Sequence, residues 1–460
     1  MSPRSALPPG PSLPAALQMV GFWTRPLAFM DSCRERYGKR FTIRLPFTPP
    51  FVMIADPEQV KQIFTSPPDV LHPGEGAKVL EPIVGRNSVI LLDEEAHMGQ
   101  RKLMLPAFHG ERMERLTGLM EEVTAEEVAA IPRGVPLAMH PRMQDLTLKI
   151  ILRAVFGLDP GARFDALRQR LGAMLEFGDK PISLMPPKAD SVVAKVAERV
   201  GPFAQFVRIQ EEVDEILFAL IEERRAEGAD RADVLAMLLE ATHEDGSPMS
   251  EQEIRDELLT LLVAGHETTA TTLAWAFERL LREPEVLARL VAEIDAGEEA
   301  YVTATIQETL RDRPVLPNAA PRYIAKEVTI GDWTYRPGAC LVANSYLIHH
   351  DPEIYPDPHA FRPERFLDQN PGTYTWIPFG CGRRRCLGAS FAMLEMKVVL
   401  KALLGSCELH DSGDGVEVAQ RRNIAVRPAR GGRVVVAERE RVANTGFAQS
   451  RKPESAASAT

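Results

Sequence analysis

The sequence predicts a mainly α-helical protein with a smaller β region. Helical runs with start and stop signals occur along much of the chain, and the longest covers residues 251–282. Short runs rich in β-branched and aromatic residues lie near residues 41–54 and 321–343. Hydrophobic residues make up 45% of the 460 residues. This share is ample for a sizeable core.

The N-terminal part predicts two helices separated by two strands. The predicted elements are a helix over 15–39, strands over 41–45 and 51–54, and a short helix that Asp56-Pro57 opens and that ends at residue 64. Prolines and glycines interrupt residues 66–93, which predict a long loop. A loop of this length inside a compact enzyme is usually functional.

Several helices are expected between this loop and the centre of the chain. They cover residues 94–108, 111–155 with a break around 132–141, 171–177, and 203–227. Prolines at 181, 186 and 187 interrupt the pattern after residue 177 and predict a further loop.

The helix predicted over 251–282 has clear end signals. Ser250 is placed as the N-cap and Glu253 as its capping-box partner, and Glu283-Pro284 stops the pattern. At ~1.5 Å per residue this helix would be about 48 Å long, the width of a domain.

The middle of this helix, residues 264–269 (Ala-Gly-His-Glu-Thr-Thr), breaks its apolar pattern. A mid-helix glycine costs about 1 kcal/mol relative to alanine. Thr268 is able to donate a hydrogen bond to a carbonyl one turn earlier and kink the helix. Broken local rules are expected at functional sites. A solvated Glu-Thr-Thr surface is the alternative, and His266 is interpreted as structural.

The C-terminal third predicts a helix with Glu308 and Arg311 on one face, short strands, and a last long helix. The strands are expected from Arg322 and over 328–330 and 339–343, and the last helix over 388–404. The core is expected to end near residue 438. Residues 439–460 are rich in Ser, Ala and Arg and predict a disordered tail.

Residues 379–388 (Phe-Gly-Cys-Gly-Arg-Arg-Arg-Cys-Leu-Gly) form the most informative stretch, here named the cysteine loop. A partly buried thiolate needs hydrogen-bond donors or a positive field. Backbone N–H groups of a glycine-rich turn at a helix N-terminus provide both. Such a thiolate at Cys386 suits haem iron, where a cysteine ligand favours O–O cleavage. A turn with an inert buried cysteine is the alternative.

The cysteine loop resembles the F-G-x-G-x-R-x-C-x-G haem-ligand loop of the cytochrome P-450 superfamily of haem-thiolate monooxygenases, with every fixed position filled. The resemblance extends from about residue 10 to Ala437. It implies the cytochrome P-450 fold, with the long helix crossing haem b (iron protoporphyrin IX). It also implies that Cys386 is the iron ligand and that Phe379, Gly380 and Gly388 are cofactor-binding residues of the same loop.

The resemblance assigns roles to further residues. Glu267 and Thr268 match the acid and alcohol that deliver protons during oxygen activation. The expected propionate contacts are His97, Arg101, Arg322 and Arg384. Glu308 and Arg311, with Arg365 from the Phe-Arg-Pro-Glu-Arg-Phe segment at 361–366, would form a structural network behind the haem. The loops at 66–93 and after residue 177 correspond to the roof and lid of the pocket.

Pocket candidates are mostly apolar, which suggests a lipophilic substrate such as a fatty acid, terpenoid or steroid. These candidates are Leu261, Leu262, Ala264, Val315, Leu316, Ala319, Ile424 and Ala425. The resemblance implies insertion of one oxygen atom from O2 into this substrate.

Composition and charge argue against several other classes of protein. The net charge of −10 argues against nucleic-acid binding. The five cysteines are scattered and favour a reducing cytosol. We find no transmembrane run and no signal peptide. Pro-Pro-Gly-Pro at 8–11 resembles the hinge after the membrane anchor of eukaryotic relatives, and without an anchor the chain looks like a soluble bacterial member. We expect a cytoplasmic monomer with a Pro-rich segment at 1–14 and one domain over 15–438.

No reductase module is expected within the chain, so electrons should come from a ferredoxin and an NAD(P)H-dependent ferredoxin reductase. Arg383, Arg384, Arg385, Lys397 and Lys401 are candidates for a basic docking patch, although Arg384 is instead assigned to a propionate. The alternatives are a peroxide-driven peroxygenase, an oxygen-independent haem-thiolate isomerase or dehydratase, and a haem-binding sensor without turnover.

Overall fold

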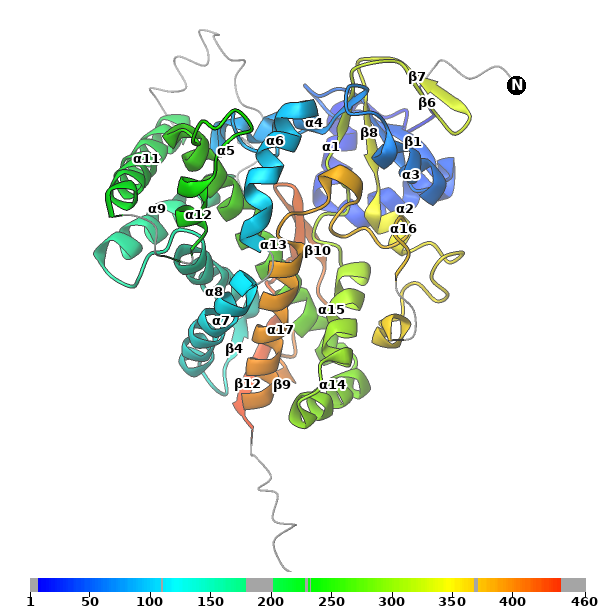
Figure 1. Cartoon of the computed structure of the whole chain (residues 1–460). Coiled ribbons are helices and arrows are strands. Elements are labelled where there is room, and N and C mark those ends of the chain that lie inside the picture. The colour runs from blue at the N-terminus through cyan, green and yellow to red at the C-terminus, as the bar shows by residue number, and fades with distance from the viewer. Residues whose placement is uncertain are drawn as a thin grey trace, which may run out of the picture.

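The computed structural model describes residues 7–108, 111–178, 202–227, 231, 233–367 and 371–439. Its α-helices are α1 (Ala15–Thr24), α2 (Pro26–Tyr37), α3 (Pro57–Thr65), α4 (Pro73–Gly76), α5 (Glu81–Val84), α6 (Glu94–Met104), α7 (Glu111–Ala130), α8 (Met139–Ala154), α9 (Ala162–Gly178), α11 (Pro202–Glu227), α12 (Val234–Glu240), α13 (Glu251–Arg282), α14 (Pro284–Ala296), α15 (Ala300–Asp312), α16 (Ser345–His349) and α17 (Ala389–Ser406). Figure 1 shows α13 inside the molecule, with α7, α8, α15 and α17 around it.

The strands are short and form four sheets. They are β1 (Arg40–Ile43), β2 (Phe51–Ile54), β3 (Leu71–His72), β4 (Pro136–Ala138), β5 (Arg322–Ile324), β6 (Val328–Ile330), β7 (Trp333–Tyr335), β8 (Cys340–Ala343), β9 (Cys407–Asp411), β10 (Ala419–Arg422), β11 (Ala425–Pro428) and β12 (Arg433–Glu438). The mainly α-helical prediction with a smaller β region is therefore confirmed.

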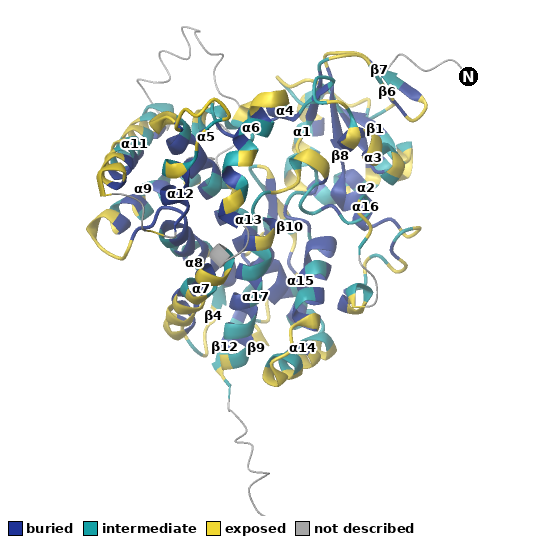
Figure 2. Ribbon diagram, viewed as in Figure 1, coloured by how far each residue is buried: buried dark blue, intermediate teal, exposed yellow. Residues whose placement is uncertain are grey.

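Helix α13 has the predicted bounds and organises the helical part of the molecule. Ser250 Oγ accepts the N–H of Glu253 at 3.2 Å, and the Glu253 carboxylate accepts the N–H of Ser250 at 2.8 Å. This capping box satisfies two backbone donors that the first helical turn leaves free. Most residues of α13 are buried, as Figure 2 shows. A helix that is buried all around is expected in the core of a large domain.

Gly265 lets α13 approach α8 closely. A Cβ atom at this position would lie 3.2 Å from Ile151 Cδ1 of α8. The mid-helix glycine therefore has a packing role, which compensates its unfavourable helix propensity.

The largest sheet has the strand order β1-β2-β8-β5-β3. Strand β2 pairs in parallel with β8, so that Phe51 lies opposite Cys340, and the other neighbours are antiparallel. A second hydrophobic core around this sheet includes Phe41, Ile54 and Leu341. Figure 1 shows this sheet together with α1, α2 and α3, apart from the helical core.

Two element predictions are corrected. The predicted helix over 15–39 is two helices, because the chain leaves the helical conformation at Arg25 (φ −138°, ψ 63°) and Pro26 begins α2. Proline fits the first helical turn because its missing N–H is not needed there. Helix α9 begins at Ala162, well before the predicted start at 171.

The long loop predicted over 66–93 contains β3, α4 and α5, although each of these is short. The loop predicted around prolines 181, 186 and 187 and the tail from residue 440 lie outside the described residues. No helix in the described ranges is long and apolar enough to span a bilayer.

Candidate active site

The cysteine loop is held in a tight conformation by its glycines and its backbone. Gly380 and Gly382 have positive φ values of 64° and 63°, a region that non-glycine residues rarely adopt. A Cβ at Gly382 would also lie 3.0 Å from the carbonyl oxygen of Phe64. The N–H of Cys386 donates to the carbonyl of Phe379 at 2.9 Å, and α17 begins after Gly388.

The thiol of Cys386 is exposed and lies beside positively charged groups. All five cysteines belong to the described residues, and Cys386 is the one that is exposed. Burial nevertheless raises the pKa of this thiol, while a backbone hydrogen bond from Gly388 and the charges of Arg101 and Arg385 act in the opposite direction. Donors and positive charge beside the sulfur are what a thiolate ligand requires.

The middle of helix α13 contains an exposed residue. Ala264 is exposed although most of α13 is buried. The Thr268 hydroxyl donates to the carbonyl of Ala264 at 2.7 Å, which is the predicted bond to the preceding turn. His266 is buried and its Nδ1 lies 3.0 Å from Thr147 Oγ1 of α8, in agreement with its structural interpretation.

Glu267 is held by side chains that sequence reasoning did not find. Its carboxylate lies 3.2 Å from His140 Nε2, 2.5 Å from Gln144 Nε2 and 3.2 Å from Thr271 Oγ1. Burial would raise the pKa of Glu267, but the hydrogen bond and charge of His140, with further help from His266 and Gln144, lower it below its ordinary value. The carboxylate is therefore kept ionised and fixed against α8.

Four predicted propionate contacts form a cationic cluster, here defined as His97, Arg101, Arg322 and Arg384. His97 is buried, and its pKa falls to about 3, first because of burial and then because of nearby Arg384, Arg101 and Arg383. Burial and the charge of Arg384 lower the pKa of Arg322 to about 10. Burial also lowers the pKa of Arg384 to about 10, and the charge of Arg101 acts in the same direction, so the positive charges within the cluster oppose one another.

Few acceptors in the described chain balance this cluster. Arg384 donates to Asp93 at 2.7 Å and to the carbonyls of Val89 and Leu92. Arg322 donates to the carbonyl of Ala320 at 3.2 Å, and its guanidinium carbon lies 4.2 Å from the centroid of the Phe64 ring. Several buried positive charges that share the single carboxylate of Asp93 are energetically unfavourable. The cluster therefore fits a group that brings carboxylates, as haem b does with its two propionates.

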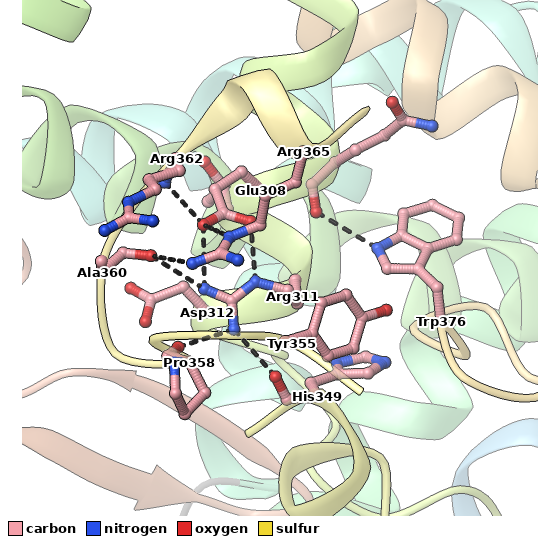
Figure 3. A network of polar contacts seen from close by, with 12 residues as sticks. Glu308, Arg311, Asp312, His349, Tyr355, Pro358, Ala360, Arg362, Arg365 and Trp376 are labelled. Carbon is pink, nitrogen blue, oxygen red and sulfur yellow. Dashed lines mark hydrogen bonds and ion pairs between the residues drawn. The ribbon is translucent and has the colours of Figure 1, made fainter. Parts of the chain in front are cut away.

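The predicted contacts among Glu308, Arg311 and Arg365 are present (Figure 3). Arg311 Nε and Nη2 donate to the two oxygens of Glu308 at 2.7 and 2.8 Å. Arg365 Nε lies 3.5 Å from Glu308, and the N–H of Arg362 donates to Glu308 at 2.7 Å. Arg311 also donates to the carbonyls of His349 and Pro358, both at 2.8 Å. Glu308 and Arg311 are both 0% exposed.

This network connects to the segment that enters the cysteine loop. His349 Nε2 accepts the N–H of Ile377 at 2.9 Å, and the indole N–H of Trp376 donates to the carbonyl of Gln307 at 3.2 Å. The sequence alone gave no sign that His349 and Trp376 connect these two segments.

The predicted pocket residues have different environments. Leu262, Val315 and Ala425 are buried, Leu261, Leu316 and Ala319 are half-buried, and Ala264 and Ile424 are exposed. The N–H of Val426 donates to the carbonyl of Val315 at 2.8 Å. This bond ties the segment after α15 to strand β11.

Comparisons with known proteins give the family of this chain. The family model described as cytochrome P450 matches residues 7–436. Two relatives from Mycobacterium tuberculosis are named putative cytochrome P450 138 and putative cytochrome P450 135B1. The first is 39% identical over 439 residues, covering 95% of this chain and 98% of the relative. The second is 38% identical over 442 residues, covering 94% and 91%.

Two solved structures share the fold. The cytochrome P450DA heme domain has a TM-score of 0.81 at 23% identity, covering 95% of this chain and 99% of that chain. The retinoic acid-bound cyanobacterial CYP120A1 has a TM-score of 0.79 at 22% identity, covering 94% and 100%. The chain therefore belongs to the cytochrome P450 family of haem-thiolate monooxygenases, and thiolate-ligated haem b is its cofactor.

Proposed function

We propose that this protein inserts one oxygen atom from O2 into a lipophilic substrate, with electrons from a separate ferredoxin and ferredoxin reductase. One observation carries this proposal: the exposed Cys386 thiol lies near Arg101, a member of the cationic cluster. A sulfur ligand beside groups that bind carboxylates suits a porphyrin with propionates. Residues 15–438 are proposed to form the single domain that carries this activity.

Each part of the site has a proposed task. Bound haem supplies the redox chemistry that activates O2. Cys386 would supply the thiolate ligand, losing its proton when the metal binds. His97, Arg101, Arg322 and Arg384 would orient the propionates by charge-assisted hydrogen bonds.

Protons are proposed to pass through Glu267 and Thr268 of α13. The Glu267 carboxylate lies beside His140 and is able to take up and release a proton there. Thr268 presents a hydroxyl one residue further along the helix. The side chains of α8 fix the orientation of the Glu267 carboxylate, so a proton taken up there would be released from a defined place.

Replacing Thr268 by alanine is expected to retain haem and substrate binding while diverting reductant to hydrogen peroxide. The change removes the hydroxyl that would guide protons, but no ligand of the iron. The ratio of hydrogen peroxide formed to NAD(P)H consumed should rise several-fold. Thr272→Ala is a matched control, since Thr272 Oγ1 bonds the carbonyl of Thr268 one turn away at 2.9 Å. Equal, tight coupling in both variants would remove Thr268 from the proton path.

The ferredoxin that donates electrons is proposed to dock at a hollow of about 730 Å³ beside the cysteine loop and α17. Arg385, Lys397 and Lys401 line it together with the acidic Glu121 and Glu299. Glu299 pairs with Lys401 at 2.6 Å and with Lys397 at 3.7 Å. The patch is thus less basic than the sequence suggested, because one carboxylate offsets two lysines.

Reduction by an acidic ferredoxin is expected to slow as ionic strength rises, because salt screens steering charges. Lys401→Ala should slow reduction at low salt, whereas Glu299→Gln should accelerate it by leaving the lysines uncompensated. Stopped-flow reduction at several salt concentrations measures both effects. Arg36→Gln on α2 provides a control, since Arg36 is exposed and does not line the hollow. Rates independent of salt would contradict this docking site.

The activity test compares three conditions for one substrate that shifts the Soret band. Turnover with NAD(P)H, reductase and ferredoxin supports the monooxygenase. Turnover with hydrogen peroxide alone would support a peroxygenase. A stable complex with O2 that consumes no reductant would support a sensor.

A further inference from the structure

The β10–β11 hairpin is attached to two walls of the proposed substrate pocket. The N–H of Val426 donates to the carbonyl of Val315 after α15, and the indole N–H of Trp275 on α13 donates to the carbonyl of Val426 at 3.1 Å. Its two-residue turn contains Ile424, a predicted pocket residue that is 43% exposed. The hairpin is therefore placed to contact a bound substrate.

Arg421 on this hairpin is buried without an acidic partner. It lies opposite Val426 in the strand register and is 8% exposed. Its Nε donates to the carbonyl of Phe22 in α1 at 3.2 Å, and its guanidinium carbon lies 3.9 Å from the centroid of the Phe22 ring. Its Nη2 has no hydrogen-bond partner, and no carboxylate in the described ranges forms an ion pair with Arg421.

Arg311 is a buried arginine with a structural role, and its hydrogen-bond partners can be compared with those of Arg421. Its guanidinium has two bonds to Glu308 and further bonds to backbone carbonyls. Arg421 has one carbonyl and one aromatic ring in place of these partners. Since a buried charge without a counter-ion is costly, a structural role alone does not account for Arg421.

The other face of the hairpin is also positively charged. Arg422 and Arg427 alternate with Arg421 and Val426 along the strands, so they lie on the opposite face. Burial, followed by the charge of Arg427, lowers the pKa of Arg422 to about 10, and the acid that opposes this shift is Glu176 of α9. Burial alone lowers the pKa of Arg421 to about 10. An anion bound to Arg421 would therefore offset the cost of burying its charge.

We propose that Arg421 binds the carboxylate of the substrate, and that the substrate is a long-chain carboxylic acid. The guanidinium would donate two parallel hydrogen bonds to the carboxylate, while the apolar chain would extend along Val426, on the same face of the hairpin, and Val315 towards α13. This inference rests on the proposed monooxygenase function, because it assigns the substrate of that same site.

The test compares straight-chain carboxylic acids of 8 to 18 carbons with the primary alcohols of equal length at pH 7.4. Binding to the holoenzyme is measured by the substrate-induced Soret shift and by calorimetry. For the best chain length we expect the acid to bind about 10- to 100-fold more tightly than the alcohol, the range for a charge-assisted bond. Arg421→Gln should remove this preference and leave alcohol binding unchanged, and Arg421→Lys should keep part of it.

Controls separate this inference from the proposed function. Arg36→Gln removes one exposed positive charge and should keep the full acid preference. The spectrum of the reduced carbon monoxide complex shows whether each variant is folded with thiolate-ligated haem. The substrate assignment is overturned if wild-type protein that shows this spectrum binds no acid, or binds acids and alcohols equally. It is also overturned if Arg421→Gln keeps the preference. A wild type without that spectrum would instead refute the proposed function.

Discussion

Replacing Cys386 by serine is expected to abolish the red-shifted Soret band of the reduced carbon monoxide complex and all monooxygenase turnover. The band depends on a sulfur ligand, and a serine hydroxyl does not ionise to take its place near neutral pH. The surrounding donors suit an anion at this position, since Gly388, Arg101 and Arg385 all favour the thiolate. Spectra of the purified variant after haem-supplemented expression measure the effect.

Cys381→Ser is the matched control for this prediction. Cys381 belongs to the same loop, but it is buried and its sulfur lies 2.8 Å from the carbonyl of Thr373. A serine there is able to donate the same hydrogen bond, so the band should be retained. If Cys386→Ser kept the band and Cys381→Ser lost it, the ligand assignment would be wrong.

Replacing Glu308 by alanine is expected to destabilise the protein by roughly 3–5 kcal/mol, because it leaves the buried charge of Arg311 without its carboxylate. Both side chains are fully buried, so solvent screens their interaction little. The loss should extend to haem retention, since Arg311 contacts the carbonyl of His349 and His349 binds Ile377 before the cysteine loop. Denaturant unfolding, followed by far-UV circular dichroism and by Soret absorbance, measures both effects.

An exposed ion pair in the same region serves as the comparison. Glu364 lies 2.9 Å from Arg289, and both side chains are about half exposed. Glu364→Gln should cost about 1 kcal/mol or less, because exposed pairs contribute little. Replacing Glu308 and Arg311 together by leucine and methionine should recover much of the loss. A Glu308→Ala cost as small as that of Glu364→Gln would contradict the role given to this network.

The sequence by itself determined the features that depend on neighbouring residues. Ser250 and Glu253 form the predicted capping box, and Thr268 bonds the predicted carbonyl at Ala264. Glu308 and Arg311 are three residues apart on one helix, so their contact follows from helix geometry. The glycine pattern of the cysteine loop likewise describes a local backbone path. The break before Pro26 was missed because the helical pattern on both sides of it is continuous.

Only the tertiary structure decided which distant groups meet. His140 and Gln144 share one face of α8, but nothing in their spacing indicates that they bind Glu267 more than 120 residues later. Helix packing, helped by the missing side chain at Gly265, brings these groups together. The isolation of Arg421 is also a tertiary property, because whether a charge has a counter-ion depends on every chain segment around it. Local hydrogen bonding is encoded in short stretches, whereas burial and charge balance result from packing of the whole chain.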